Sequence, residues 1–194
     1  ESGRSELDIH TFDILGLIRE TESAVIPLLQ EAGNSLDVRC DPAIGSMNAD
    51  QNRIQRVLVS LLKSASKSTQ KGAVVLSGSR ESVDGVDWIN FNVIDSGPGI
   101  SLEVLRSLFK DYTQADAVTS SVYGGTALAV AICQRFSFMM GGNVFVESEP
   151  GKGAAFTLRI PAEMQVHLAK SHVVRATNRL IRDLLDLDIK EKDA

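Results

Sequence analysis

The chain has 194 residues, of which 43% are hydrophobic, and it carries a formal net charge of −5 at pH 7. A chain of this length can bury a full hydrophobic core, so one compact domain with an appendage is expected. The acidic balance disfavours a nucleic-acid or membrane-surface binder, because phosphate backbones and anionic lipids would repel it. No apolar run reaches the length of a membrane span and no signal peptide is recognisable, so we expect a cytoplasmic protein without direct membrane contact.

The first half of the chain predicts two helices separated by short extended segments. Apolar residues at helical spacing indicate a helix over residues 12–31, with Pro27 as a possible kink. Extended segments follow at residues 36–40 and 45–48. Asp50 is a good N-cap for a second helix, which Gly72 is expected to close. The apolar stripe of this helix consists of Ile54, Val57, Leu58, Leu61, Leu62 and Ala65.

The second half predicts strands at both ends of a helical region. Residues 73–77 and 86–95 indicate a hairpin around the Asp84-Gly85 turn. A short helix should follow Ser101, and residues 110–125 have few apolar anchors, which is typical of a mobile loop. A third core helix is indicated by Leu128, Ile132, Phe136, Met139 and Met140, and a last strand by Phe156, Leu158 and Ile160. Cys40 and Cys133 lack a metal-like spacing, so a buried, reduced thiol is expected for each.

Residues 95–100 (Asp-Ser-Gly-Pro-Gly-Ile) carry the strongest chemical signal. Asp95 falls on the same face of its strand as Ile89, Phe91 and Val93, so its carboxylate enters an apolar pocket. An adenine amino group could supply the hydrogen-bond donor that this carboxylate needs, while the glycines let a base approach the backbone. The motif is equally compatible with an ordinary turn after a strand.

Four further segments resemble the ATP-binding domain of histidine kinases, a family that shares its fold with Hsp90, DNA gyrase B and MutL. Residues 50–69 are similar to the asparagine box, D-x-x-R-L-x-Q-V-L-x-N-L-L-x-N-A-x-K-F-T, and residues 108–114 to the phenylalanine box. Residues 123–132 are similar to the second glycine box, G-G-T-G-L-G-L-A-I, and residues 141–156 to the closing hairpin. The resemblance covers about residues 5–162 and implies an α+β fold, a two-layer α/β sandwich. The spacing of apolar residues after Pro161 predicts a C-terminal helical extension.

The resemblance also implies roles in nucleotide binding. Asp95 would accept the adenine amino proton, and Gly97 and Gly99 would lie under the base. Lys67 is either a phosphate partner or a solvated lysine at a helix end, and Phe109 packs either under the ATP lid or in the core. The full implied set is Asn52, Ser60, Ser64, Lys67, Asp95, Gly97, Gly99, Ile100, Phe109, Gly124, Gly125, Thr126, Ala127 and Leu128.

The chain departs from the family at the phosphate and metal end. Ser60 and Ser64 replace the two asparagines of the box, and Ser64 stands at the Mg²⁺ position; a serine hydroxyl reaches less far than an amide oxygen. Ala127 and Ala129 replace glycines, which limits close backbone approach to phosphates. The expected cofactors are therefore ATP and Mg²⁺. For each of them, normal binding, weak binding and no binding all remain open.

Two main functions follow. One is a sensor histidine kinase domain that passes the γ-phosphate of ATP to a histidine on a separate dimerisation domain, with a response regulator as a further partner. The other is a degenerate domain that acts through protein contacts. A gyrase- or chaperone-like ATPase is weaker, since Val57 and Val59 provide no acid to activate water.

The expected domains are a linker remnant at residues 1–10, the ATP-binding domain at 11–162 and an amphipathic helix at 163–194. Within that helix, apolar residues recur at Val173, Leu180, Leu184 and Leu187, which indicates association, including a homodimer. His10 and His172 are expected to be surface residues rather than a catalyst or a phosphoacceptor.

Overall fold

The structure is a computed structural model, which describes residues 7–101, 103–105 and 124–164. The chain divides between Met164 and Gln165 into two units, and the described helices and strands all belong to the first unit. In addition to a helical segment at residues 103–105, the elements are β1 (His10–Asp13), α1 (Ile14–Glu31), β2 (Ser35–Cys40), β3 (Ser46–Ala49), α2 (Gln51–Ser68), β4 (Ala73–Val83), β5 (Val86–Asp95), α4 (Gly124–Met139), β6 (Asn143–Ser148) and β7 (Ala154–Pro161).

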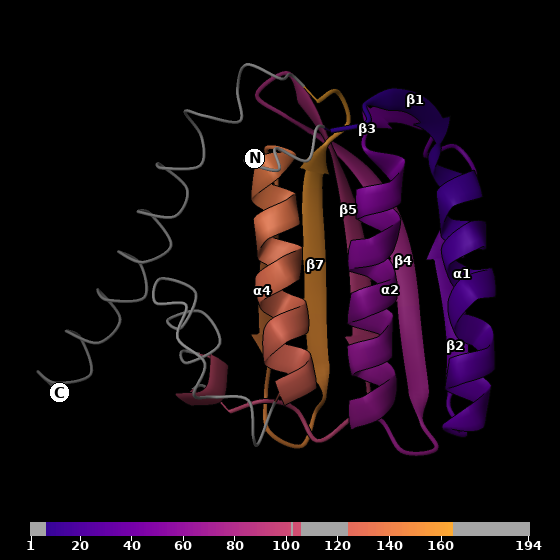
Figure 1. Ribbon diagram of the computed structural model, residues 1–194, viewed down its shortest axis with the longest axis vertical. Coiled ribbons are helices and arrows are strands. Elements are labelled where there is room, and N and C mark those ends of the chain that lie inside the picture. The colour runs from indigo at the N-terminus through magenta and orange to yellow at the C-terminus, as the bar shows by residue number, and fades with distance from the viewer. Residues whose placement is uncertain (1–6, 102, 106–123, 165–194) are drawn as a thin grey trace, which may run out of the picture. The chain divides into compact units, whose positions relative to one another are not determined.

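The main sheet has the strand order β2-β4-β5-β7-β6. β2 runs parallel to β4, and the other neighbours are antiparallel. The helices α1, α2 and α4 lie side by side on one face of this sheet, while β1 and β3 form a small second sheet at its upper end in Figure 1. The predicted two-layer α+β fold is confirmed.

The core lies between the sheet and the three helices. The central strands direct every second side chain toward the helical layer, as the period of a strand requires. Each fully buried aliphatic or aromatic side chain contributes roughly 1.5–3 kcal/mol to stability. Those of the central strands are Val74, Leu76, Ile89, Phe91, Val93, Phe156, Leu158 and Ile160.

The helix α2 begins as predicted, because the Asp50 side chain accepts a hydrogen bond from the Arg53 amide at 3.0 Å. The Arg53 side chain also forms a buried ion pair with the Asp50 carboxylate at 2.9 Å. The helix ends at Ser68 with Thr69 as C-cap, so the prediction that Gly72 closes it is wrong. The side chain of Asn34 ends the helix earlier, because it donates to the carbonyl oxygen of Thr69 at 3.0 Å.

Two other boundaries also differ from prediction. α1 begins at Ile14 rather than at residue 12, because Asp13 caps the helix by accepting a hydrogen bond from the Gly16 amide at 2.8 Å. Phe12 instead lies in β1, where it pairs with Met47. β4 continues to Val83 rather than ending at residue 77. Its last residues form a two-stranded ribbon with β5, and this exposed end lacks the alternation of apolar residues on which the prediction relied.

The buried face of α4 differs from the predicted one. The predicted stripe included Ile132, but that side chain is 40% exposed, and the helix instead buries Val130, Cys133 and Ser137. Met140, directly after the helix, is buried as predicted. The Ser137 hydroxyl donates to the Cys133 carbonyl oxygen, so a serine occupies a core position without an unpaired polar group. Cys133 is a buried free thiol as expected, whereas Cys40 is free but only partly buried. No helix in the described part of the chain has the length and hydrophobicity that crossing a membrane would require.

Candidate nucleotide site

Asp95 lies at the end of β5, and its side chain is 5% exposed. It continues the buried alternation of Ile89, Phe91 and Val93, as the sequence predicts. Burial raises the pKa of the Asp95 carboxyl, while hydrogen bonds with the Gly97 and Ala154 amides and the Ser68 hydroxyl oppose part of that rise. The site therefore contains a hydrogen-bond acceptor, the Asp95 carboxyl, at the end of the apolar face of β5.

The chain after Asp95 turns sharply at two glycines. The Gly97 amide donates to Asp95 Oδ1 at 2.8 Å, and a Cβ at Gly97 would lie 2.7 Å from the same oxygen. Gly99 has a φ of +73°, and a Cβ there would lie 2.2 Å from the Glu149 carbonyl oxygen. Both positions therefore require glycine for the packing of the chain itself. Ile100 is partly buried, and its amide donates to Ser148 Oγ at 2.8 Å.

The polar residues of α2 lie at increasing distances from Asp95, whose carboxyl is close to Ser68 at the end of the helix. At 1.5 Å per residue, Ser64 lies about 6 Å, Ser60 about 12 Å and Asn52 about 24 Å along the axis from Ser68. Ser64 is buried, Ser60 is half-buried, and Asn52 and Lys67 are exposed. The structure thus brings Ser64 and Lys67 to the Asp95 end of the helix and leaves Asn52 at the opposite end.

The N-terminus of α4 lies at the same end of the sheet as Asp95. α4 ends just before β6, β6 runs to Ser148, and both Ser148 and Asp95 pair with Ala154. The helix begins at Gly124 and Gly125, so its free amides and positive dipole end are directed toward this end of the molecule (Figure 1). Thr126, Ala127 and Leu128 follow in the first turns of the helix. Phe109 and the predicted loop at 110–123 lie outside the described residues.

Two residues of the site, Asn34 and Ala154, were not predicted from the sequence. Asn34 is buried, and its side chain ties the end of α2 to the following loop, accepting from the Gly72 amide at 3.1 Å. The dipeptide Gly33-Asn34 indicates a turn, but it does not indicate this contact with Gly72. Ala154 lies directly opposite Asp95 in the pairing of β5 with β7, and only that long-range register places its amide at the carboxylate.

The described residues do not build a metal site from protein ligands. They contain no group of three or more His, Cys, Asp or Glu side chains that could hold a metal ion. Ser64 offers a neutral hydroxyl where the family resemblance implies an amide oxygen, and Mg²⁺ prefers several oxygen ligands in octahedral geometry. A metal ion at this site would therefore take most of its ligands from groups other than these side chains.

A sequence model of the family described as histidine kinase-, DNA gyrase B- and HSP90-like ATPase matches residues 49–164. Hybrid signal transduction histidine kinase B of Dictyostelium discoideum is 36% identical over 163 residues, which are 83% of this chain and 8% of that protein. Sensor histidine kinase RcsC of Escherichia coli (strain K12) is 32% identical over 162 residues, 83% of this chain and 17% of that protein. The chain thus spans less than a fifth of the length of these relatives.

Solved structures agree with these matches. Full-length ShkA in complex with AMPPNP is 31% identical, with a TM-score of 0.67, over 82% of this chain and 32% of that chain. The nucleotide-free catalytic domain of the histidine kinase ThkA has a TM-score of 0.66 at 21% identity, over 80% of this chain and 97% of that chain. At this lower identity the second likeness concerns the fold alone.

Proposed function

The chain belongs to the histidine kinase-, DNA gyrase B- and HSP90-like ATPase family, as the ATP-binding catalytic domain of sensor histidine kinases, and we propose that it supplies the γ-phosphate of ATP to a histidine on a separate dimerisation domain. The observation that carries this proposal is Asp95, a buried carboxylate within the matched residues, at the end of the helical layer where α4 begins. A bound nucleotide analogue in the related ShkA structure supports the same ligand class.

In the proposed mechanism, Asp95 accepts a hydrogen bond from the adenine amino group and so fixes the base. Gly97 and Gly99 keep the backbone beneath the base free of side chains. The amides of Gly124 and Gly125, at the positive end of the α4 dipole, would face the phosphates together with Lys67. Positioning and charge neutralisation carry phosphoryl transfer, so no side chain of this chain needs to act as a covalent nucleophile.

Mg²⁺, when bound with ATP, neutralises phosphate charge. Because Ser64 presents a hydroxyl, we propose that phosphate oxygens and water hold most of this ion and that its contribution to affinity is small. The alternative of a degenerate domain rests on Ser60, Ser64, Ala127 and Ala129, and the names of the relatives as kinases favour the active form.

The proposed partners are a histidine-containing dimerisation domain and a response regulator, in a cytoplasmic setting. We also propose that residues 163–194 contribute to a homodimer through the apolar residues of their predicted helix.

Isothermal titration with ATP and with a non-hydrolysable analogue, each with and without Mg²⁺, tests the function. We expect both nucleotides to bind with similar affinity, because the base and the phosphate chain are recognised before any transfer occurs. Absence of binding at millimolar concentrations of either nucleotide would refute the proposed kinase.

A further inference from the structure

The neighbouring helices α2 and α4 contain no aspartate or glutamate. Their exposed cations are Arg56, Lys63, Lys67 and Arg135, although the whole chain carries a net charge of −5. α1, the next helix of the same layer, carries both signs of charge. The outer surface of α2 and α4 is therefore a positive region on an acidic protein, which favours anionic partners.

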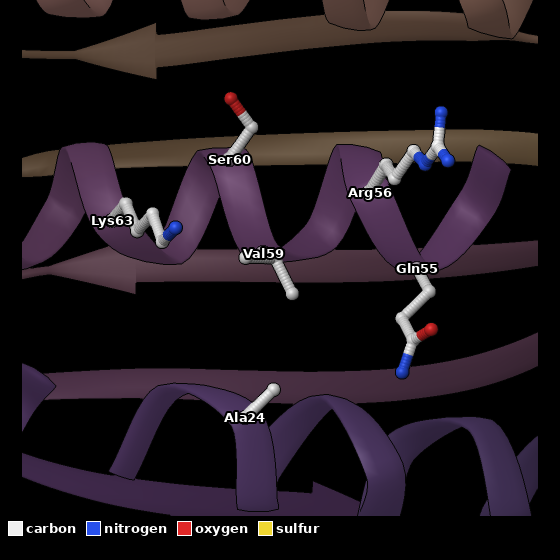
Figure 2. A pocket seen from close by; sticks show the side chains of 6 residues that line it. All are labelled: Ala24, Gln55, Arg56, Val59, Ser60 and Lys63. Atoms are coloured by element: carbon white, nitrogen blue, oxygen red, sulfur yellow. The ribbon is translucent and has the colours of Figure 1, made fainter. Parts of the chain in front are cut away.

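A groove of about 430 Å³ lies along α2, with one lining residue from α1. In Figure 2, Arg56 and Ser60 point to one side of the helix, while Val59 points to the other side, where Ala24 of α1 points back toward it. The groove thus has cations along its length and a small apolar surface beside them. Its lining consists of Ala24, Gln55, Arg56, Val59, Ser60 and Lys63.

The cations of the groove are available to a partner. Neither the Arg56 nor the Lys63 side chain takes part in an ion pair or hydrogen bond with another residue of the described ranges. The two residues lie seven positions apart, which is about two helical turns and about 10.5 Å along the axis. A facing helix with carboxylates at positions i and i+7 reproduces this spacing, whereas a single small anion does not span it.

We propose that this groove is a docking site for an acidic helix of a partner protein, with carboxylates over Arg56 and Lys63 and small apolar side chains against Val59 and Ala24. The charge pairs would give the contact its register and speed the encounter, and the apolar surface would add affinity. The residues that make the proposed contacts, Arg56, Val59, Lys63 and Ala24, lie outside the implied nucleotide-binding set, so the docking contact does not depend on the proposed nucleotide function. Ser60 alone belongs to both the groove and that set.

The test uses the full chain and a synthetic alanine-rich helical peptide with two glutamates seven residues apart. We expect the peptide to shift the backbone NMR signals of the groove residues. The double substitution Arg56→Gln, Lys63→Gln should weaken binding about tenfold, from the loss of two exposed charge pairs. The matched control, Arg19→Gln with Lys71→Gln, removes the same charge from exposed residues elsewhere and should bind as the unchanged protein does.

Four results would overturn the proposal. One is the absence of groove shifts, and another is equal weakening by the control variant, which would show non-specific charge attraction. The third is equal binding of a peptide with glutamines in place of the glutamates. The fourth is displacement of the peptide by an equal concentration of inorganic phosphate, which would assign the groove to small anions. ATP titrations on the same samples keep a failure of the nucleotide site separate from a failure of this docking site.

Discussion

Ala154 and Asp95 face each other across the antiparallel pair of β7 and β5, and the Ala154 amide hydrogen-bonds to the Asp95 carboxyl. The hydrogen bond comes from the backbone, so it does not depend on the identity of the side chain at position 154. The Gly97 amide also donates to this carboxylate, so the main chain of two separate segments holds it. Its orientation is therefore fixed before any ligand arrives.

Asp95→Ala is expected to weaken ATP binding by roughly 1–3 kcal/mol, the usual cost of leaving a buried polar partner unpaired. Calorimetric titration measures the change directly. Asp37→Ala, at an exposed carboxylate of β2, is the matched control and should retain the original affinity. Unchanged affinity in the Asp95 variant would remove this residue from the nucleotide site.

The raised pKa of Asp95 predicts a pH effect on stability. In the window between the ordinary value of 3.8 and the raised folded value, the folded state binds the proton more tightly than the unfolded state. The contribution of this group to the free energy of unfolding therefore falls as pH rises through that window. The variant Asp95→Asn has no ionisable group at this position and so lacks this pH dependence. Chemical denaturation should therefore show that the variant gains stability relative to the unchanged protein as pH rises. Parallel pH curves for the two proteins would contradict the assignment.

The position of Asp95 could be predicted from the sequence because strand alternation is local: three apolar residues at period two fix where the next side chain points. The buried face of α4 could not be read in the same way, since Ser137 is polar yet fully buried through a hydrogen bond within its own helix. The contact of Asn34 with Ser66 spans 32 positions, and no local pattern encodes it. Prediction therefore succeeded where apolar residues alone marked the buried face, and it failed where a hydrogen-bonded polar side chain was buried, either within one helix at Ser137 or across a long-range contact at Asn34.

Asn34→Ala should destabilise the domain by roughly 1–3 kcal/mol, because buried backbone groups at the end of α2 lose their partner. Thermal or chemical denaturation measures the loss. Ser23→Ala, which removes an exposed hydroxyl from α1, is a control with little expected effect. A similar change in both variants would show that the Asn34 contacts do not hold this helix end.

Mg²⁺ should improve ATP affinity little, and ADP should bind about as well as ATP, because Ser64 provides a hydroxyl instead of an amide oxygen. Ser64→Asn is expected to increase the dependence of ATP affinity on Mg²⁺. Since Ser64 is buried, a thermal melt of the variant must first show that the larger side chain is accommodated. Strong Mg²⁺ dependence in the unchanged protein would show that Ser64, or water that it holds, performs the role of the asparagine.

The C-terminal residues are expected to mediate association. The division of the chain after Met164 gives a natural truncation point, since the sheet and its helices are complete at that residue. Removal of residues 165–194 should leave a folded, more monomeric domain with unchanged nucleotide binding, because Val173, Leu180, Leu184 and Leu187 would otherwise expose an apolar stripe. Light scattering measures the mass of both proteins, and Leu184→Glu with Leu187→Glu tests the stripe in the full chain. If the truncation instead lowers the melting temperature while the mass stays the same, the segment stabilises its own domain and does not join two copies.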